Sequence, residues 1–146
     1  MVYANTSFLG SFFVPDANSP AALTVVQSLT VSIAFTALHR LELRDALALA
    51  VFQGRMSNYQ AQAVWQDVDC DLRSGLFLAT PLKWYPILRK AALLSTQYTI
   101  TTGCRSLDVL HVATALKMGT SKFLSFDLRQ RSLATVLGLD VIPLGQ

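Results

Sequence analysis

Short apolar runs alternate with longer amphipathic segments along the chain. The short runs are rich in β-branched and aromatic residues, which favour strands, and they lie at 2–4, 31–35, 77–79, 122–126 and 141–143. Between them, apolar residues recur at helical spacing. Apolar strands that alternate with helices are typical of a parallel sheet covered by helices on both faces. We therefore expect an α/β protein built on one parallel sheet.

Cap and turn residues indicate where the predicted helices begin and end. Asn5 and Thr36 each follow a predicted strand directly, and such residues accept hydrogen bonds from the free N–H groups of a first helical turn. Helices are expected from about residue 6 and over 37–52, 56–74, 81–98, 106–118 and 128–137. Pro81 would open the helix 81–98, and Pro86 would distort its first turn.

Composition narrows the class of protein. At 146 residues we expect one domain, residues 1–146, and a content of 52% hydrophobic against 14% charged residues excludes a disordered chain. A membrane-spanning helix needs roughly 18 nearly uncharged apolar residues, and polar residues interrupt every run before that length. Because the first basic residue is Arg40, and Asn5, Pro15 and Asp16 break up the first apolar segment, the N-terminus does not resemble a secretory signal. We expect a cytoplasmic protein.

Several common kinds of site are absent from the sequence. Cys70 and Cys104 lack a CxxC spacing and neighbouring histidines, which argues against a zinc site or a disulfide framework. No GxGxxG or P-loop motif is present, which argues against a nucleotide-binding protein with similar strand and helix order.

Charge is divided unevenly between the two halves of the chain. The formal net charge of +3 is made up of −3 over residues 1–72 and +6 over residues 73–146. A basic half favours a polyanionic partner such as nucleic acid. Solvated helix faces explain the same charges equally well.

Four polar residues lie where burial is expected. Asn5 and Asp127 directly follow predicted strands, so both would project at the carboxyl edge of the sheet, where ligands bind in such folds. Glu42 and Asp108 lie on helix faces that are otherwise largely apolar. The face of Glu42 holds Leu38, Leu41, Asp45 and Leu49, and that of Asp108 holds His111, Val112 and Ala115.

Each of the four also has a structural interpretation. Asn5 and Asp127 would serve as helix caps, the latter with Gln130 at the spacing of a capping box, and Asp108 would be a first-turn acid favoured by the helix dipole. Glu42 would pair with an arginine of its own helix. Oxygen ligands that converge on one sheet edge are, however, what Mg²⁺ and Mn²⁺ select. Taken together, the four residues favour a divalent-metal site.

Four segments of the chain resemble a known family. They are VYANTSFL at 2–9, LEL at 41–43, RSLDVLHVATAL at 105–116 and KFLSFD at 122–127. Their order and spacing resemble a PIN domain, and the closest subgroup is the VapC-like toxin ribonucleases of bacterial toxin–antitoxin pairs. The resemblance covers essentially the whole chain, and the D-x-x-H-x-A-x-A run followed by the strand ending in Ser-Phe-Asp is its most specific part.

The resemblance implies a three-layer α/β/α sandwich with a central, mainly parallel sheet of four to five strands. It also implies an endoribonuclease whose acids bind Mg²⁺ or Mn²⁺. By position, the catalytic and metal-binding residues are Glu42, Asp108 and Asp127, with Asn5 where the family has its first aspartate, and Ser125 is the polar residue near the last acid. An amide in place of a carboxylate removes one negative charge and adds two donors that a cation repels. We therefore expect metal affinity and activity to be lowered.

The same resemblance implies partners. These are an RNA substrate, a cognate antitoxin protein and a second copy of the chain in a homodimer. The basic residues expected along the RNA backbone are Lys83, Arg89, Lys90, Lys117, Lys122, Arg129 and Arg131. His111 is expected to form structural hydrogen bonds rather than to act as a general base. The alternative is a catalytically inactive PIN-like module that keeps the fold and binds RNA or an antitoxin peptide.

Overall fold

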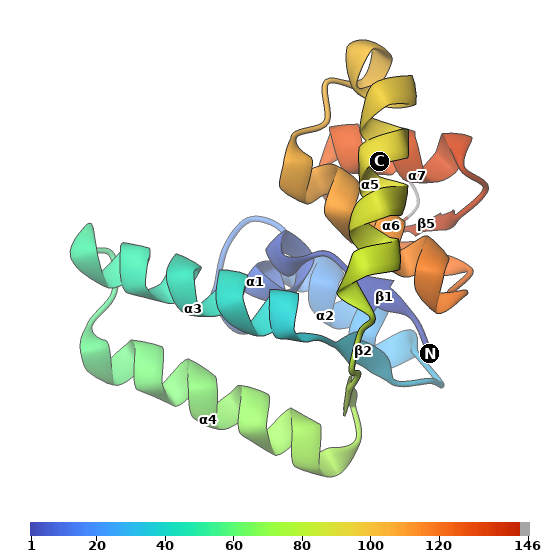
Figure 1. The fold of residues 1–146 in the computed structure, drawn as a ribbon. Coiled ribbons are helices and arrows are strands. Elements are labelled where there is room, and N and C mark those ends of the chain that lie inside the picture. The colour runs from blue at the N-terminus through green and yellow to red at the C-terminus, as the bar shows by residue number, and fades with distance from the viewer. Residues whose placement is uncertain (144–146) are drawn as a thin grey trace.

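The computed structural model describes residues 1–143, and its strands all pair in parallel (Figure 1). The strands are β1 (Tyr3–Ala4), β2 (Ile33–Phe35), β3 (Phe77–Ala79), β4 (Lys122–Leu124) and β5 (Asp140–Ile142). One part of the sheet has the order β1-β4-β5, and the other pairs β2 with β3. A parallel bridge between Val2 and Ile33 joins the two parts, so the strands follow one another as β3-β2-β1-β4-β5.

Helices connect the strands and lie on both faces of the sheet. They are α1 (Thr6–Phe13), α2 (Ser19–Ser28), α3 (Ala37–Phe52), α4 (Asn58–Ser74), α5 (Trp84–Thr102), α6 (Ser106–Met118) and α7 (Leu128–Val136). Figure 1 shows α3 and α4 side by side at one end of the molecule, and α5, α6 and α7 gathered at the other. None of the helices within residues 1–143 is both long enough and apolar enough to cross a membrane.

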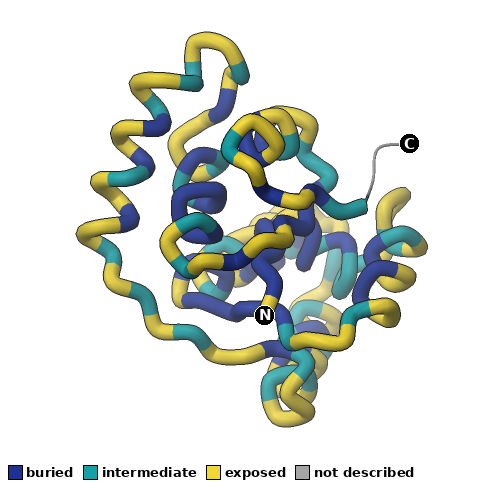
Figure 2. Tube along the Cα trace, turned by 90° about the vertical axis from the view of Figure 1, so that its right-hand side faces the viewer, coloured by how far each residue is buried: buried dark blue, intermediate teal, exposed yellow. Residues whose placement is uncertain are grey.

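Alternate strand residues enter two separate hydrophobic cores. In β1, Ala4 packs with α1, α2 and α3, whereas Tyr3 packs with α5, α6 and α7. In β4, Leu124 and Phe123 divide in the same way. Because successive side chains of a strand point to opposite faces, this division places one core on each side of the sheet. The expected three-layer α/β/α sandwich is confirmed, and Figure 2 shows the buried positions concentrated along its middle.

The structure differs from the expected elements in several places. Helix α2 was not predicted from the sequence. Helix α5 begins at Trp84, not at Pro81, so Pro86 lies in its first turn, where a missing N–H leaves no helical hydrogen bond unmade. The helix runs through Thr102 and ends at Gly103, whose left-handed φ of 67° allows the chain to leave it.

Candidate functional site

The carboxyl ends of β1 and β4 bring Asn5 and Ser125 together. The strands are neighbours, and the Asn5 N–H donates to the carbonyl of Leu124 at 2.9 Å. Asn5 caps helix α1, because its Oδ1 accepts from the N–H of Phe8 at 2.8 Å. Its Nδ2 donates to Ser125 Oγ and to Gln130 Oε1, both at 3.0 Å. The expected cap is confirmed, and the amide also points into a polar cluster.

Asp108 and Asp127 occupy the first turns of two helices that begin near this cluster. Asp108 Oδ2 accepts from the N–H of Arg105 at 2.8 Å, at the start of α6. Asp127 caps α7 and accepts from the N–H groups of Arg129 and Gln130, both at 2.9 Å. The structural interpretation is therefore confirmed for both acids. It does not exclude a metal, since each carboxylate oxygen has further lone pairs.

Gln130 is a site residue that the sequence analysis assigned to the wrong partner. A capping box would turn its side chain back to the N–H of Asp127, but that N–H donates to Ser125 Oγ at 3.1 Å. Gln130 instead accepts from Asn5 and donates through Nε2 to Asp108 Oδ1 at 2.8 Å. Its side chain is buried and joins residue 5 to the first acid of α6. The spacing between Asp127 and Gln130 indicated only that Asp127 would cap the backbone N–H of Gln130.

Glu42 is held by two donors from other helices. Its Oε2 accepts from Thr6 Oγ1 at 2.6 Å and lies 2.7 Å from His111 Nε2. Burial raises the pKa of the Glu42 carboxyl, but the hydrogen bond and charge of His111 and the hydrogen bond of Thr6 lower it by more, so the net pKa lies below its usual value. Glu42 is therefore a carboxylate with a fixed orientation, and within residues 1–143 it pairs with His111 and not with an arginine of α3, as its structural interpretation had it.

His111 forms structural hydrogen bonds, as expected. Its Nδ1 lies 2.8 Å from the hydroxyl of Tyr3. Burial raises the pKa of that hydroxyl, so Tyr3 keeps its proton. Because the Glu42 carboxylate can only accept, the Nε2 of His111 carries the hydrogen between them.

The expected apolar stripe around Glu42 is only partly correct. Leu38 is buried, but Leu41 and Leu49 are 66% and 47% exposed. The buried side of α3 continues instead through Leu43 and Leu47. Glu42 lies at the border of this buried face, which explains why it is half-buried and reaches the carboxyl edge.

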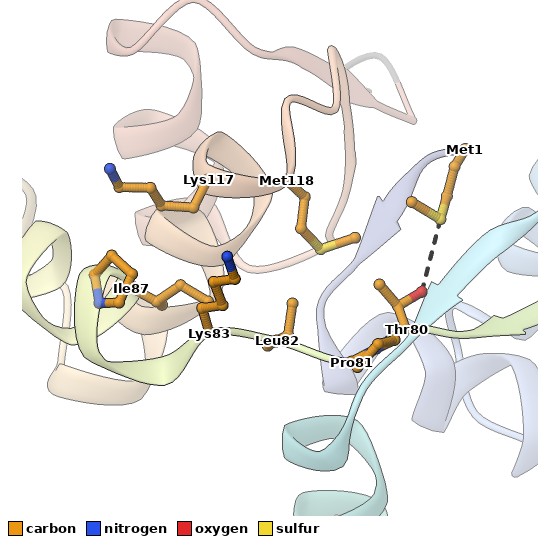
Figure 3. Close-up of a pocket in the computed structure, with 9 residues that line it drawn as sticks. Met1, Thr80, Pro81, Leu82, Lys83, Ile87, Lys117 and Met118 are labelled. Atoms are coloured by element: carbon orange, nitrogen blue, oxygen red, sulfur yellow. Dashed lines mark hydrogen bonds between the residues drawn. The ribbon is translucent and has the colours of Figure 1, made fainter.

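Four of the seven basic residues expected along the RNA lie in two separate places. Arg131 donates to the carbonyl of Ser125 at 2.7 Å, and Arg129 reaches the carbonyl of Gly103 at 3.5 Å, so both border the acids. Lys83 and Lys117 instead line a separate pocket of about 490 Å³ (Figure 3), where they lie opposite Met1 and Thr80. The seven basic residues therefore do not form one surface around the acids.

Three of the four candidate ligands are carboxylates, which suit a hard cation; the fourth is Asn5. Over residues 1–143 no three His, Cys, Asp or Glu side chains are already arranged around one point. Glu42 Oε1 and Asp127 Oδ2 accept no hydrogen bond from the described part of the chain, so oxygens that Mg²⁺ or Mn²⁺ prefers are available. Asn5 differs, because its oxygen accepts from Phe8 and its N–H groups face the cluster.

Comparisons with known proteins identify the fold. No protein-family model and no curated protein matches the sequence. Among solved structures, the chain matches FitAcB from Neisseria gonorrhoeae at 19% identity, covering 97% of this chain and 96% of the other, with a TM-score of 0.66. It also matches VapC20 from Mycobacterium tuberculosis, a sarcin–ricin loop cleaving toxin, at 15% identity, 90% and 94% coverage and a TM-score of 0.66.

A third match gives the same result. VapBC2 from Rickettsia felis, solved with a DNA fragment from its promoter, aligns at 12% identity over 97% of both chains, with a TM-score of 0.67. Such low identities establish a likeness of fold. The chain has the PIN-like fold of these VapC and FitB structures, as the sequence resemblance implied.

Proposed function

We propose that this chain is a PIN-domain endoribonuclease of the toxin type, acting in the cytoplasm with Mg²⁺ or Mn²⁺ held by Glu42, Asp108 and Asp127. The observation that supports the proposal is that Gln130 joins Asn5 to Asp108 beside the cap residue Asp127, while Thr6, the neighbour of Asn5, holds Glu42. The same fold occurs in a protein described as a sarcin–ricin loop cleaving toxin.

Residues of this chain prepare the site for hydrolysis of a phosphodiester. When bound, the divalent ion activates a water molecule and stabilises the charge that develops on the phosphate. Thr6 and His111 hold Glu42 by one oxygen and leave the other for ion or water. Arg129 and Arg131 border the acids on α7, where they would neutralise phosphates of the RNA backbone.

Asn5 sets the level of activity in this proposal. An aspartate at this position would add a negative charge and remove two N–H donors that face the cluster. We infer that the native chain binds the ion weakly and cleaves slowly. Asn5→Asp is therefore expected to increase both metal affinity and cleavage.

The proposed partners follow from the same interpretation. A protein antitoxin would place a basic side chain among the carboxylates, and solved neighbours include the FitAcB and VapBC2 assemblies. A second copy would pack on α5 and α6, where Leu88 and Leu107 are half exposed beside a groove of about 260 Å³. Burial of such apolar side chains is what a homodimer interface provides.

The direct test is cleavage of a panel of structured RNAs with Mn²⁺ or Mg²⁺. We expect slow cleavage by the native chain, faster cleavage by Asn5→Asp, and none by either protein in EDTA. Asn18→Asp adds the same charge at the exposed N-terminus of α2 and serves as the matched control. If native and Asn5→Asp chains are both folded and neither cleaves RNA, the proposal is wrong.

One observation favours a second function. Every hydrogen-bonding atom of the Asn5 side chain has a protein partner without a metal, as in a site that no longer turns over. On this alternative the chain keeps the fold and binds RNA or an antitoxin peptide without cleavage. Cleavage by Asn5→Asp but not by the native chain would support it.

A further inference from the structure

A chain of hydrogen bonds runs through the buried side of the site from Ser125 through Asn5 and Gln130 to Asp108. Asn5 Nδ2 lies 3.0 Å from Ser125 Oγ and from Gln130 Oε1, and Gln130 Nε2 lies 2.8 Å from Asp108 Oδ1. Asn5 and Gln130 are 1% and 4% exposed. Within residues 1–143 no buried side-chain nitrogen or oxygen lacks a partner. The network is complete without a cation.

The helix cap formed by Asn5 fixes the direction of the hydrogen bonds in this network. The N–H of Phe8 donates at 2.8 Å to the Asn5 side chain, and only the amide oxygen can accept it. The NH₂ group of Asn5 must then face Gln130, which presents its own oxygen. Gln130 is left with its NH₂ group turned toward Asp108. Each side chain thus determines the orientation of the next.

We propose that Gln130 is a positioning residue that transmits the identity of residue 5 to Asp108, and that Asn5, Gln130 and Asp108 form an amide bridge that stabilises the site without a cation. Gln130 holds Asp108 Oδ1, while the N–H of Arg105 holds Oδ2. The orientation of this carboxylate therefore depends on an amide that itself depends on Asn5. The part of the inference that concerns a cation rests on the proposed function.

An aspartate at residue 5 breaks the amide bridge. One oxygen would still cap Phe8, and the other would accept from the Ser125 hydroxyl, but it would also face the oxygen of Gln130. Gln130 carries one NH₂ group and can turn it toward residue 5 or toward Asp108, so one carboxylate is left facing an amide oxygen. A divalent cation relieves that repulsion. The Asn5→Asp chain therefore depends on the cation for stability, and the native chain does not.

Thermal unfolding in EDTA and in Mn²⁺ tests this dependence. In EDTA, Asn5→Asp is expected to melt about 5 °C below the native chain, because a buried carboxylate is left facing an acceptor. Saturating Mn²⁺ is expected to restore most of this loss. The native chain and Asn18→Asp should respond little. The inference is overturned if Asn5→Asp is as stable as the native chain in EDTA, or if Mn²⁺ raises all three melting temperatures equally.

A reversal of polarity tests the role of Gln130. Gln130→Glu places an oxygen opposite Asp108 Oδ1 and should lower the melting temperature by about 5 °C or more. Adding Asp108→Asn restores a donor at that contact, since its oxygen can still accept from the N–H of Arg105 and its NH₂ can donate to the new carboxylate. The double variant should therefore melt at a higher temperature than Gln130→Glu. Asp108→Asn alone should not raise the melting temperature of the native chain. If the second change brings no recovery, Gln130 does not position Asp108.

The two sets of experiments separate this inference from the proposed function. The polarity reversal is measured in EDTA without RNA, so it depends on neither metal nor cleavage. Recovery in the double variant, together with no cleavage by Asn5→Asp, would support the amide bridge and refute the ribonuclease. Cleavage by Asn5→Asp with no recovery in the double variant would do the opposite.

Discussion

The two halves of the acid site are held in different ways. In one half, Glu42 accepts from Thr6 and His111 through a single oxygen, and its other oxygen accepts no hydrogen bond from residues 1–143. In the other half, the side chains of Asn5 and Gln130 use their hydrogen-bonding groups on each other and on their neighbours. A carboxylate fixed by donors remains available to a ligand, whereas a paired amide does not. Substitutions in each half should therefore have different effects on metal binding.

The largest effect is expected from Glu42→Gln in the Asn5→Asp background. The change keeps the size of the side chain but removes the charge available to a cation. We expect Mn²⁺-dependent RNA cleavage to fall by at least about 100-fold. Asp45→Asn makes the same change of charge at an exposed position of the same helix, and it should leave the rate within a few-fold. Equal losses in the two variants would remove Glu42 from the site.

Variants of the two buried histidines should distinguish loss of the fixed Glu42 orientation from loss of fold stability. His111 donates to Glu42, whereas His39 Nε2 donates to the carbonyl of Ala4 and Nδ1 accepts from the N–H of Thr36. His111→Gln is expected to weaken Mn²⁺ binding about 10-fold, because Glu42 loses its fixed orientation. His39→Gln should lower stability without that loss. Calorimetric titration of both variants in the Asn5→Asp background measures the difference.

The free energy of unfolding is expected to decrease as pH falls, because His39 takes up a proton more readily in the unfolded chain. Burial, and then the charge of His111, lower its pKa from 6.5 to about 3. Between these values the unfolded chain binds a proton that the folded chain does not, so the free energy of unfolding decreases as pH falls, by about 1.4 kcal/mol per pH unit for one proton. Urea unfolding between pH 7.5 and pH 5 measures the slope. It should be smaller in His39→Gln, and an unchanged slope would contradict the assignment.

Fold prediction from the sequence succeeded where caps and apolar runs agree. Asn5, Thr36 and Gly119 mark helix ends that the structure reproduces. Helix α2 was missed because its apolar residues are not confined to one face: Ala22, Val25 and Val26 are buried, but Leu23 is 48% exposed. The start of α5 was misplaced because Pro81 and Pro86 are both compatible with a first turn, and only tertiary packing selects between them.

The candidate site was predicted less completely than the fold. The positions of Asn5, Asp108 and Asp127 at one edge follow from strand ends and helix starts, which the sequence marks. The contacts of Gln130 could not be predicted, because they join positions that are far apart in the sequence. Its side chain hydrogen-bonds to Asn5, at a separation of 125 positions, and to Asp108, at a separation of 22. Such contacts depend on which strands are neighbours and on how the helices cross them.

The smallest effect is expected at the arginines that border the acids. Arg129→Gln removes one charge beside Asp127, so one fewer phosphate of the RNA is neutralised. The slope of the logarithm of the RNA affinity against the logarithm of the salt concentration should then become shallower by about 0.7. Arg73→Gln, an exposed arginine at the end of α4, is the matched control and should leave the slope unchanged. Similar slopes for native chain, variant and control would place the RNA elsewhere.

The Mn²⁺ concentration at half-maximal RNA cleavage, measured for the native and Asn5→Asp chains, tests the central claim most directly. The account predicts that Asn5→Asp reaches half-maximal cleavage at a concentration at least about tenfold lower, because residue 5 changes from a paired amide to a charged ligand. Equal concentrations for the two chains, or cleavage that persists in EDTA, would contradict it.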